Sequence, residues 1–177
     1  MDRRLSIKTL LIISVGAAVL PSCLHEEKRT SISLKNIKID GHDEELFSNV
    51  SETIIPTTDT PGAKDFSAHL FALMMVDDCY APAEQGKFVK GLKDFKEFSK
   101  KKFDKPFVKC TSSQKQEILQ SIETNKNVPE DVAYFYSVAK KLTIQAFASS
   151  KYYLTKVHVY QLVPGKFYGC VLVKKVS

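Results

Sequence analysis

The sequence predicts an all-α fold, a single helical domain of about five helices with a non-helical C-terminal tail. Apolar residues recur every three or four positions in several stretches between residues 43 and 149, which is the spacing of one helix face. Prolines and polar turn residues separate these stretches. The last 28 residues lose this spacing and become aromatic and β-branched, so we expect extended segments there, with at most one short strand pair.

The first two predicted helices lie on either side of a polar turn. Residues 43–55 place Leu46 and Val50 on one helix face, and Pro56 ends that helix. Residues 66–79 form the most apolar stretch of the predicted domain, which indicates a central and largely buried helix. This stretch is shorter than the roughly 20 apolar residues that a membrane-spanning helix needs.

Three further helices follow in the second half of the chain. Pro82 lies in the first turn of the third helix, which ends in three consecutive lysines that suit the negative end of a helix dipole. Ser113 and Gln116 have the spacing of a capping box and predict the start of the fourth helix. Pro129 precedes the fifth helix, which we expect to run to about Ser149.

The first 22 residues have the pattern of a bacterial export signal, with a basic start, an uncharged apolar stretch and a small residue before Cys23. The pair Arg3 and Arg4 resembles a twin-arginine signal, which serves proteins that are exported already folded. The residues that precede Cys23 resemble a lipobox, in which this cysteine carries the lipid. A transmembrane helix is the alternative, but the apolar run falls short of roughly 20 residues. We therefore expect a lipid-anchored protein on the periplasmic side of the cell envelope.

The rest of the chain divides into a tether and one domain. Residues 23–42 are charged at first and then rich in serine, threonine and lysine, which predicts a tether to the lipid anchor. Residues 43–177 have the length of a single domain with its own core. Removal of the signal, which carries Arg3, Arg4 and Lys8 against Asp2, lowers the net charge from +6 to +4, and only one arginine follows the signal, so we expect no nucleic-acid partner.

Three cysteines remain if Cys23 carries lipid: Cys79, Cys110 and Cys170. An odd number in an oxidising compartment suggests one disulfide and one further thiol, although three inert buried thiols are the alternative. Two arrangements of Cys170 are open. It pairs with Cys79 or Cys110 and fixes the tail, or it bonds to a cysteine of a partner chain.

The tail also contains aromatic residues that are candidates for the centre of an interface. These residues are Tyr160, Phe167 and Tyr168. Aromatic side chains supply much of the binding energy in protein interfaces. We therefore expect the tail either to lie over the helices or to contact a partner.

The sequence contains no catalytic, cofactor-binding or metal-binding motif that we recognise. Its four histidines are scattered, and Cys-x-x-Cys, Gly-x-Ser-x-Gly and glycine-rich phosphate loops are absent. Asp77 and Asp78 are adjacent, but neighbours on a helix point roughly 100° apart, which favours a solvated helix end. His69 lies on the most apolar helix and is interpreted as a core or interface histidine. An enzyme in its own right is the less favoured alternative.

The turn segment after Pro56 contains Thr58, Asp59, Thr60, Pro61 and Gly62. We expect the Asp59 carboxylate to accept hydrogen bonds from backbone N–H groups, as aspartates in turns commonly do. We also expect Pro61 to fix the entry to the next helix. The segment is then either a structural connector or a docking site for a partner.

This turn also carries a resemblance to a known family. The residues Ile54-Ile55-Pro56-x-Thr58-Asp59-Thr60-Pro61-Gly62-Ala63 resemble the opening motif of the gluconate 2-dehydrogenase subunit 3 family. Similar elements follow in the family's order, and the resemblance covers roughly residues 43–171. These elements are Asp78-Cys79, the helix start from Thr111 to Gln116, the helix from Phe135 to Phe147, and Pro164-Gly165-x-x-Tyr168-Gly169-Cys170.

The resemblance implies a non-catalytic small subunit that holds no cofactor. Its partner would be a large FAD-dependent dehydrogenase of the glucose-methanol-choline type, which oxidises a sugar or sugar acid. The large subunit would be exported together with the small one, and a cytochrome c subunit is a further partner in related complexes. The alternative is a stand-alone envelope lipoprotein that binds a polymer or another protein.

Overall fold

The computed structural model describes residues 29–124, 127–158, 160–163, 165 and 169–170. The predicted signal with Arg3 and Arg4, the predicted lipidation site Cys23, and the tail residues Phe167 and Tyr168 lie outside the described residues.

Five α-helices make up most of the described chain, as the sequence predicts. They are α2 (Gly41–Ile54), α3 (Ala68–Cys79), α4 (Pro82–Phe103), α5 (Ser112–Thr124) and α6 (Glu130–Ala148). A short 3-10 helix, η1 (Phe107–Lys109), follows α4, and a π-helical turn, η2 (Tyr153–Val157), follows α6. The described residues contain no β-strand, so the all-α prediction is confirmed.

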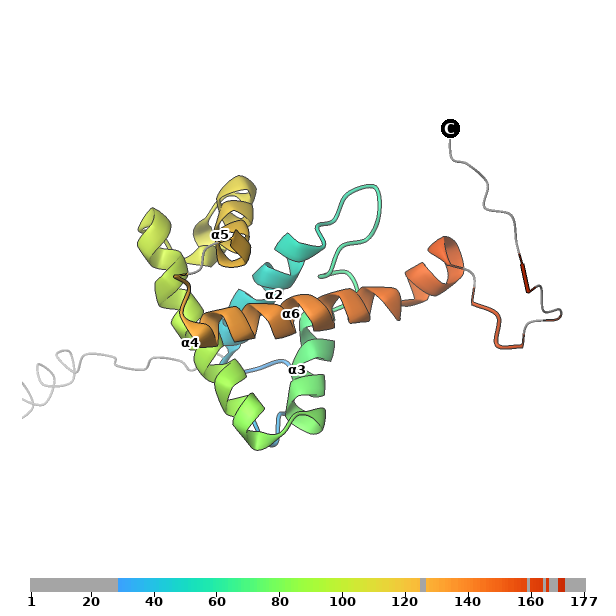
Figure 1. Cartoon of the computed structure of the whole chain (residues 1–177), viewed down its shortest axis with the longest axis horizontal. Coiled ribbons are helices and arrows are strands. Elements are labelled where there is room, and N and C mark those ends of the chain that lie inside the picture. Colours follow the sequence, from blue (N-terminus) through green and yellow to red (C-terminus); the bar gives the residue numbers. More distant parts are fainter. Residues whose placement is uncertain (1–28, 125–126, 159, 164, 166–168, 171–177) are drawn as a thin grey trace, which may run out of the picture.

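Helix α6 runs through the middle of the domain and contacts every other α-helix, with its most extensive contacts to α4 and α3 (Figure 1). The crossing of α4 and α6 is close because Gly91 has no side chain. A Cβ atom at Gly91 would collide with the backbone oxygen of Asp131 and with the Cβ of Phe135. Only glycine lets the two backbones approach this closely.

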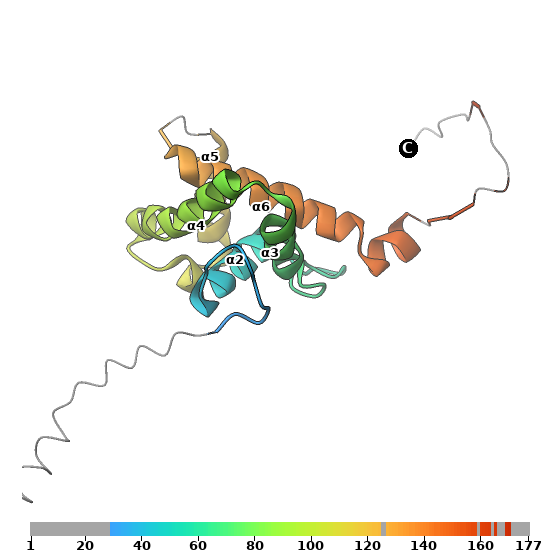
Figure 2. The same cartoon turned by 90° about the horizontal axis from the view of Figure 1, so that it is seen from below.

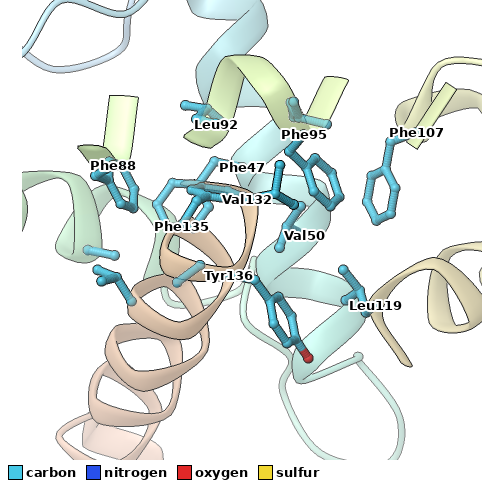
Figure 3. Close-up of a cluster of buried hydrophobic side chains, with 14 of the residues drawn as sticks. Phe47, Val50, Phe88, Leu92, Phe95, Phe107, Leu119, Val132, Phe135 and Tyr136 are labelled. Carbon is cyan, nitrogen blue, oxygen red and sulfur yellow. The ribbon is translucent and has the colours of Figure 1, made fainter. Parts of the chain in front are cut away.

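The core is built around four phenylalanine rings from three helices (Figure 3). Phe135 of α6 lies between Phe47 of α2 and Phe88 and Phe95 of α4, with ring centroids 5.2–5.8 Å apart. Phe107 of η1 extends the cluster, 5.1 Å from Phe95. All five side chains are fully buried, and their tilted and edge-to-face geometry is the preferred one for aromatic pairs.

The helix ends agree with the sequence except at α5. Pro82 occupies the first turn of α4, and three lysines lie in its last turn, as predicted. At α5 the capping box is formed by Thr111 and Gln114 and not by Ser113 and Gln116. Because α5 begins at Ser112, Thr111 takes the cap position and Gln114 lies three residues later.

The N-terminal segment, residues 31–39, packs on the domain, although the sequence suggested that it belongs to a tether (Figure 2). Ile37 is only 5% exposed, and the side chains of Ile32, Leu34 and Ile39 also pack against the core. The domain therefore begins well before α2.

The start of the tail is helical, which corrects the expectation of extended chain at Tyr152 and Tyr153. Tyr152 lies in a short helical turn that continues into η2. The Tyr153 ring packs edge-on against Phe147 of α6, with centroids 5.4 Å apart. This contact explains why the helical path persists beyond the end of α6. The short strand pair considered from the sequence is not present in the described part of the tail.

Candidate functional site

The α2–α3 loop, residues 55–67, projects outward from the helices (Figure 1). Five consecutive residues at its tip, residues 56–60, are exposed, whereas Gly62 and Ala63 are buried. The loop therefore has a buried base and an open tip.

Two carboxylates, those of Glu52 and Asp65, fix the shape of this loop by accepting hydrogen bonds from its backbone. Glu52 of α2 accepts hydrogen bonds from the backbone N–H groups of Thr57 and Lys64, both at 3.0 Å. Asp65 accepts from the backbone N–H of Gly62 at 2.7 Å. The Thr57 hydroxyl lies within hydrogen-bond distance of both carboxylates, at 2.9 and 3.1 Å. The base of the loop is thus fixed by one side chain from α2, Glu52, and one from within the loop, Asp65.

Backbone contacts close the loop further. The Ala63 N–H donates to the carbonyl oxygen of Ile55 at 2.8 Å, which joins the two ends of the loop. A Cβ atom at Gly62 would collide with the backbone nitrogen and hydroxyl of Thr57. The two sides of the loop therefore touch at a point where only glycine fits.

The structure corrects two expectations for this segment. Asp59 is exposed and accepts no hydrogen bond from a described residue, because Glu52 and Asp65 bind the backbone N–H groups instead. Pro61 does not fix the entry to α3, which begins at Ala68 after a further turn. Ser67, with a φ of 51°, makes the entry.

The threonines on either side of Asp59 bond to each other across the loop tip. The Thr58 N–H donates to the carbonyl oxygen of Thr60 at 3.0 Å, and their hydroxyl groups are 3.4 Å apart. The tip is therefore a tight turn with the exposed Asp59 between the two threonines.

A second, smaller core joins the loop to the end of α6. Ala63, Ala68 and Ala146 are buried together, and partly buried apolar side chains surround them. The Phe66 ring of the loop lies 5.6 Å from Phe147 of α6, which in turn contacts Tyr153. The loop and the start of the tail are consequently parts of one packed unit.

The tail beyond this unit carries the most exposed apolar side chains among the described residues. Leu162 and Val163 are 81% and 79% exposed, and the predicted interface residue Tyr160 is 59% exposed. Contiguous exposed apolar residues commonly mark a surface that binds a partner. The described chain thus exposes two segments, a polar, ordered loop tip and an apolar tail.

Asp77 has a structural role that its sequence context did not reveal. It is 4% exposed and accepts hydrogen bonds from the backbone N–H groups of Lys35, Asn36 and Ile37, at 2.7–2.8 Å. Burial alone would raise the pKa of this carboxyl, but the three donors outweigh it and hold the pKa below its ordinary value. The solvated helix end expected from the sequence applies only to Asp78, which is exposed.

Two further polar residues, Glu44 of α2 and His69 of α3, lie close enough for their charges to interact. Glu44, which is buried, accepts from both the N–H and the hydroxyl of Ser31, at 2.7 and 2.5 Å. The Nδ1 atom of His69 is buried and has no hydrogen-bond partner among the described residues. Burial lowers the pKa of His69, so its imidazole is neutral at pH 7, in keeping with a packed histidine.

The described cysteines form no disulfide. Cys79 and Cys170 are exposed thiols, and Cys110 is buried with its Sγ 3.6 Å from the carbonyl oxygen of Pro106. The structure therefore shows no bridge from Cys170 to Cys79 or Cys110, and a bond to a partner chain stays a prediction.

A surface hollow of about 390 Å³ lies between α2, α4 and η1, with Leu46 and Phe107 in its apolar lining. Its charged residues are Glu45, Lys96, Glu97, Lys100 and Lys109. The Lys96 amino group already pairs with the buried Asp43 carboxylate at 2.5 Å. Because charges of both signs surround the hollow, it favours neither an anionic nor a cationic ligand.

Metal-binding clusters and membrane-spanning helices are absent from the described part of the chain. No group of three or more histidine, cysteine, aspartate or glutamate side chains there could hold a metal ion. None of its helices is both long and apolar enough to cross a bilayer.

Comparison with known proteins gives a family match. The family model described as gluconate 2-dehydrogenase subunit 3 matches residues 41–165, a range that includes all five α-helices and the α2–α3 loop. Comparisons with curated proteins and with solved structures gave no match. The family match covers more than half of the chain and agrees with the motif at the loop. The chain belongs to the gluconate 2-dehydrogenase subunit 3 family.

Proposed function

We propose that this chain is the accessory subunit of an FAD-dependent dehydrogenase of the glucose-methanol-choline type, which oxidises a sugar or sugar acid. The chain binds and stabilises the large flavoprotein subunit and is exported with it to the cell envelope. FAD and the catalytic residues belong to the large subunit. The family match supports the assignment to such a complex, because the family is named for a subunit of gluconate 2-dehydrogenase.

The ordered, exposed α2–α3 loop is the observation that carries this proposal. Its shape is set by Glu52 and Asp65, and none of the exposed residues 56–60 is needed to bury the core. A loop that is already ordered loses less conformational entropy when it binds, which favours tight association. A rigid loop tip of this kind suits a docking contact with a folded protein.

The apolar tail supplies the complementary part of the docking surface. Tyr160, Leu162 and Val163 expose apolar area in the tail, which follows the η2 turn that packs on Phe147 of α6. The centre of a stable interface is apolar and often aromatic, with polar contacts at its rim. We therefore propose that the tail forms the apolar centre of the interface and that the loop tip determines which partner binds.

The sequence of the first 23 residues supports the proposed export and anchoring. A flavoprotein that has already folded around FAD needs a route for folded proteins, which the twin-arginine pattern at Arg3 and Arg4 would provide. Lipidation at Cys23 would hold the complex at the membrane, since several acyl chains anchor a protein firmly. A cytochrome c subunit is a further candidate partner at this membrane.

Co-expression of a tagged chain with a flavin oxidoreductase that lacks its own export signal tests this function. We expect a flavin-bearing partner to co-purify, and the double variant Leu162→Glu with Val163→Glu to release it. A matched control is Lys101→Gln with Lys105→Gln, which changes the charge equally at exposed residues near the end of α4. Absence of a flavoprotein from the wild-type preparation would contradict the proposal.

A second experiment tests co-export. Arg3→Lys with Arg4→Lys should leave both this chain and its flavoprotein partner in the cytoplasm. Normal levels of the partner in the envelope would exclude the carrier role. Cys23→Ser should change the mass and membrane fractionation of the chain, and unchanged values of both would exclude lipidation.

A further inference from the structure

We propose that one end of the domain rests on the anionic lipid headgroups of the membrane that holds the anchor. This basic end consists of Lys100, Lys101, Lys105 and Lys109. The inference rests on the proposed function, because it takes Cys23 as the lipidated residue. It adds which side of the domain lies against the membrane and what lipid charge that side requires.

The positive charge of the chain is concentrated in residues 96–109. This stretch contains six lysines against Glu97 and Asp104, which gives it a net charge of +4. Residues 23–177 also have a net charge of +4, because the predicted signal accounts for +2 of the +6. The rest of the exported chain is therefore neutral overall, and its whole excess of positive charge lies in this one stretch.

Four of these six lysines are not neutralised within the described chain. Lys96 pairs with Asp43 at 2.5 Å, and Lys102 pairs with Glu117 at 3.1 Å. The lysines of the basic end are all exposed, and none of them forms an ion pair with a described residue. A group of exposed, unpaired lysines creates a positive potential that attracts anions.

The described chain begins on the same side of the domain as the basic end. Ser31 bonds to Glu44 in the first turn of α2, and the neighbouring Asp43 pairs with Lys96 of α4. Lys100 lies one helical turn beyond Lys96, on the same face of α4. In Figures 1 and 2 the first described residues and the C-terminal end of α4 both lie on the left, whereas the tail extends to the right.

The connection between this side of the domain and the proposed anchor is short. Because Ser31 is bonded to α2, only eight residues lead from Cys23 to the domain. Eight residues reach at most roughly 30 Å at full extension, which is about the diameter of a small domain. A lipid at Cys23 therefore lets the basic end reach the membrane surface directly, whereas the opposite end would need a nearly extended connection.

Electrostatics then favours one orientation of the anchored domain. Anionic lipids give the membrane surface a negative potential that attracts basic segments close to it, and a lipid chain commonly acts together with a basic patch. This attraction falls off within a Debye length, about 10 Å at 0.1 M salt. Contact through the basic end leaves the tail, on the opposite side, free to bind the flavoprotein.

Acetylation rates of individual lysines, measured by mass spectrometry on the purified lipidated chain in vesicles, test this inference. Phosphatidylcholine vesicles are compared with vesicles that also contain phosphatidylglycerol, an anionic lipid. We expect phosphatidylglycerol to slow acetylation of the basic end by about threefold or more at low salt, and high salt to reverse the effect. Lys151 and Lys156, which are exposed beside the tail, are internal controls and should keep their rates.

A matched pair of variants separates a specific contact from a general attraction of the chain. Lys100→Gln with Lys101→Gln removes half of the basic end and should return the rates of its remaining lysines toward those on phosphatidylcholine. Lys151→Gln with Lys156→Gln removes the same charge beside the tail and should leave the slowing intact. Because all four lysines are exposed, both variants should melt at the wild-type temperature.

Four outcomes would overturn the inference. If the basic end is acetylated equally fast on both kinds of vesicle, anionic headgroups do not hold it, while the anchor and the docking function stand. If Lys151 and Lys156 are slowed instead, the opposite side of the domain lies on the membrane. If the basic end is slowed only by added flavoprotein without vesicles, it contacts the partner subunit. If the chain floats with neither kind of vesicle, the lipid anchor fails and this inference with it, whereas co-purification of the flavoprotein tests docking separately.

Discussion

Two irregular segments of this protein are held by the same chemical device, a pair of carboxylates that accept hydrogen bonds from backbone N–H groups. Glu44 and Asp77 hold the N-terminal segment, residues 31–39, and Glu52 and Asp65 hold the α2–α3 loop. The N-terminal segment lies along the domain and buries Ile37. The loop projects from the domain and leaves its tip in solvent.

The difference between the two segments separates a stabilising role from a binding role. Asp77 and Ile37 are both buried, so the N-terminal segment adds apolar burial and satisfied hydrogen bonds to the free energy of folding. The carboxylates of the loop set its shape without burying its tip. An ordered but exposed segment contributes little to the core, and such segments commonly carry binding residues. Mutations in the N-terminal segment should therefore lower the free energy of unfolding, whereas mutations at the loop tip should weaken partner binding.

The largest effect is expected at Asp77. Asp77→Ala leaves three backbone N–H groups of the N-terminal segment without their acceptor and should lower the free energy of unfolding by roughly 3–5 kcal/mol. Denaturant unfolding measures this loss. Asp78→Ala, at the exposed neighbour, should stay within about 0.5 kcal/mol of the wild type. If Asp77→Ala and Asp78→Ala were equally stable, the stabilising role of the N-terminal segment would be contradicted.

An intermediate effect is expected at Gly62 in the loop. Gly62→Ala places a methyl group against Thr57 and should cost roughly 1–3 kcal/mol through local strain. A Cβ atom at Gly86, inside α4, would meet only open space, so Gly86→Ala should be neutral or stabilising by up to about 1 kcal/mol. Thermal melting of both variants checks this contrast, which would be lost if Gly62→Ala were as stable as Gly86→Ala.

The contacts of Asp77 with the N-terminal segment should also make the free energy of unfolding depend on pH in the acidic range. The folded pKa of Asp77 is lowered, so its carboxylate stabilises the fold above the ordinary carboxyl pKa of about 4. This stabilisation is lost as the pH falls from that value through the lowered folded pKa. Asp77→Asn, which cannot ionise, should show a shallower loss of unfolding free energy below about pH 4 than the wild type. An identical pH profile in the two proteins would exclude Asp77 as a contributor.

The smallest effect on stability is expected at the loop tip. Asp59→Ala should change the free energy of unfolding by less than about 0.5 kcal/mol, because the carboxylate has no partner in the described chain. Asp65→Ala, which removes the acceptor of the Gly62 N–H, should cost about 1 kcal/mol more. A destabilised Asp59→Ala variant would restore the structural role first expected from the sequence.

Local patterns in the sequence predicted the helices well. Apolar spacing and the prolines at positions 56, 82 and 129 placed all five helices close to their observed bounds. The capping box of α5 was predicted two residues too late, because Thr111, Ser112 and Ser113 are all suitable cap residues. Short-range chemistry alone does not select among them.

The long-range contacts were not predictable from such patterns. Asp77 binds backbone groups about 40 residues earlier in the chain, and only the packing of α2 and α3 brings them together. In the loop, the sequence predicted that the Asp59 carboxylate would bind the backbone of the turn, whereas Glu52 and Asp65 do so. Glu52 lies in α2 and reaches the loop only because the chain folds back there. The apolar spacing of Ile32, Leu34, Ile37 and Ile39 was the available sign that the N-terminal segment packs.

Hydrogen–deuterium exchange of the chain, alone and in complex with the flavoprotein, tests the separation of roles most directly. We predict that binding slows exchange in residues 56–61 and 157–163. We predict no change in the exchange of residues 31–39, which the free chain already protects through Asp77 and Glu44. Slower exchange confined to the N-terminal segment, with the loop and tail unaffected, would contradict the account.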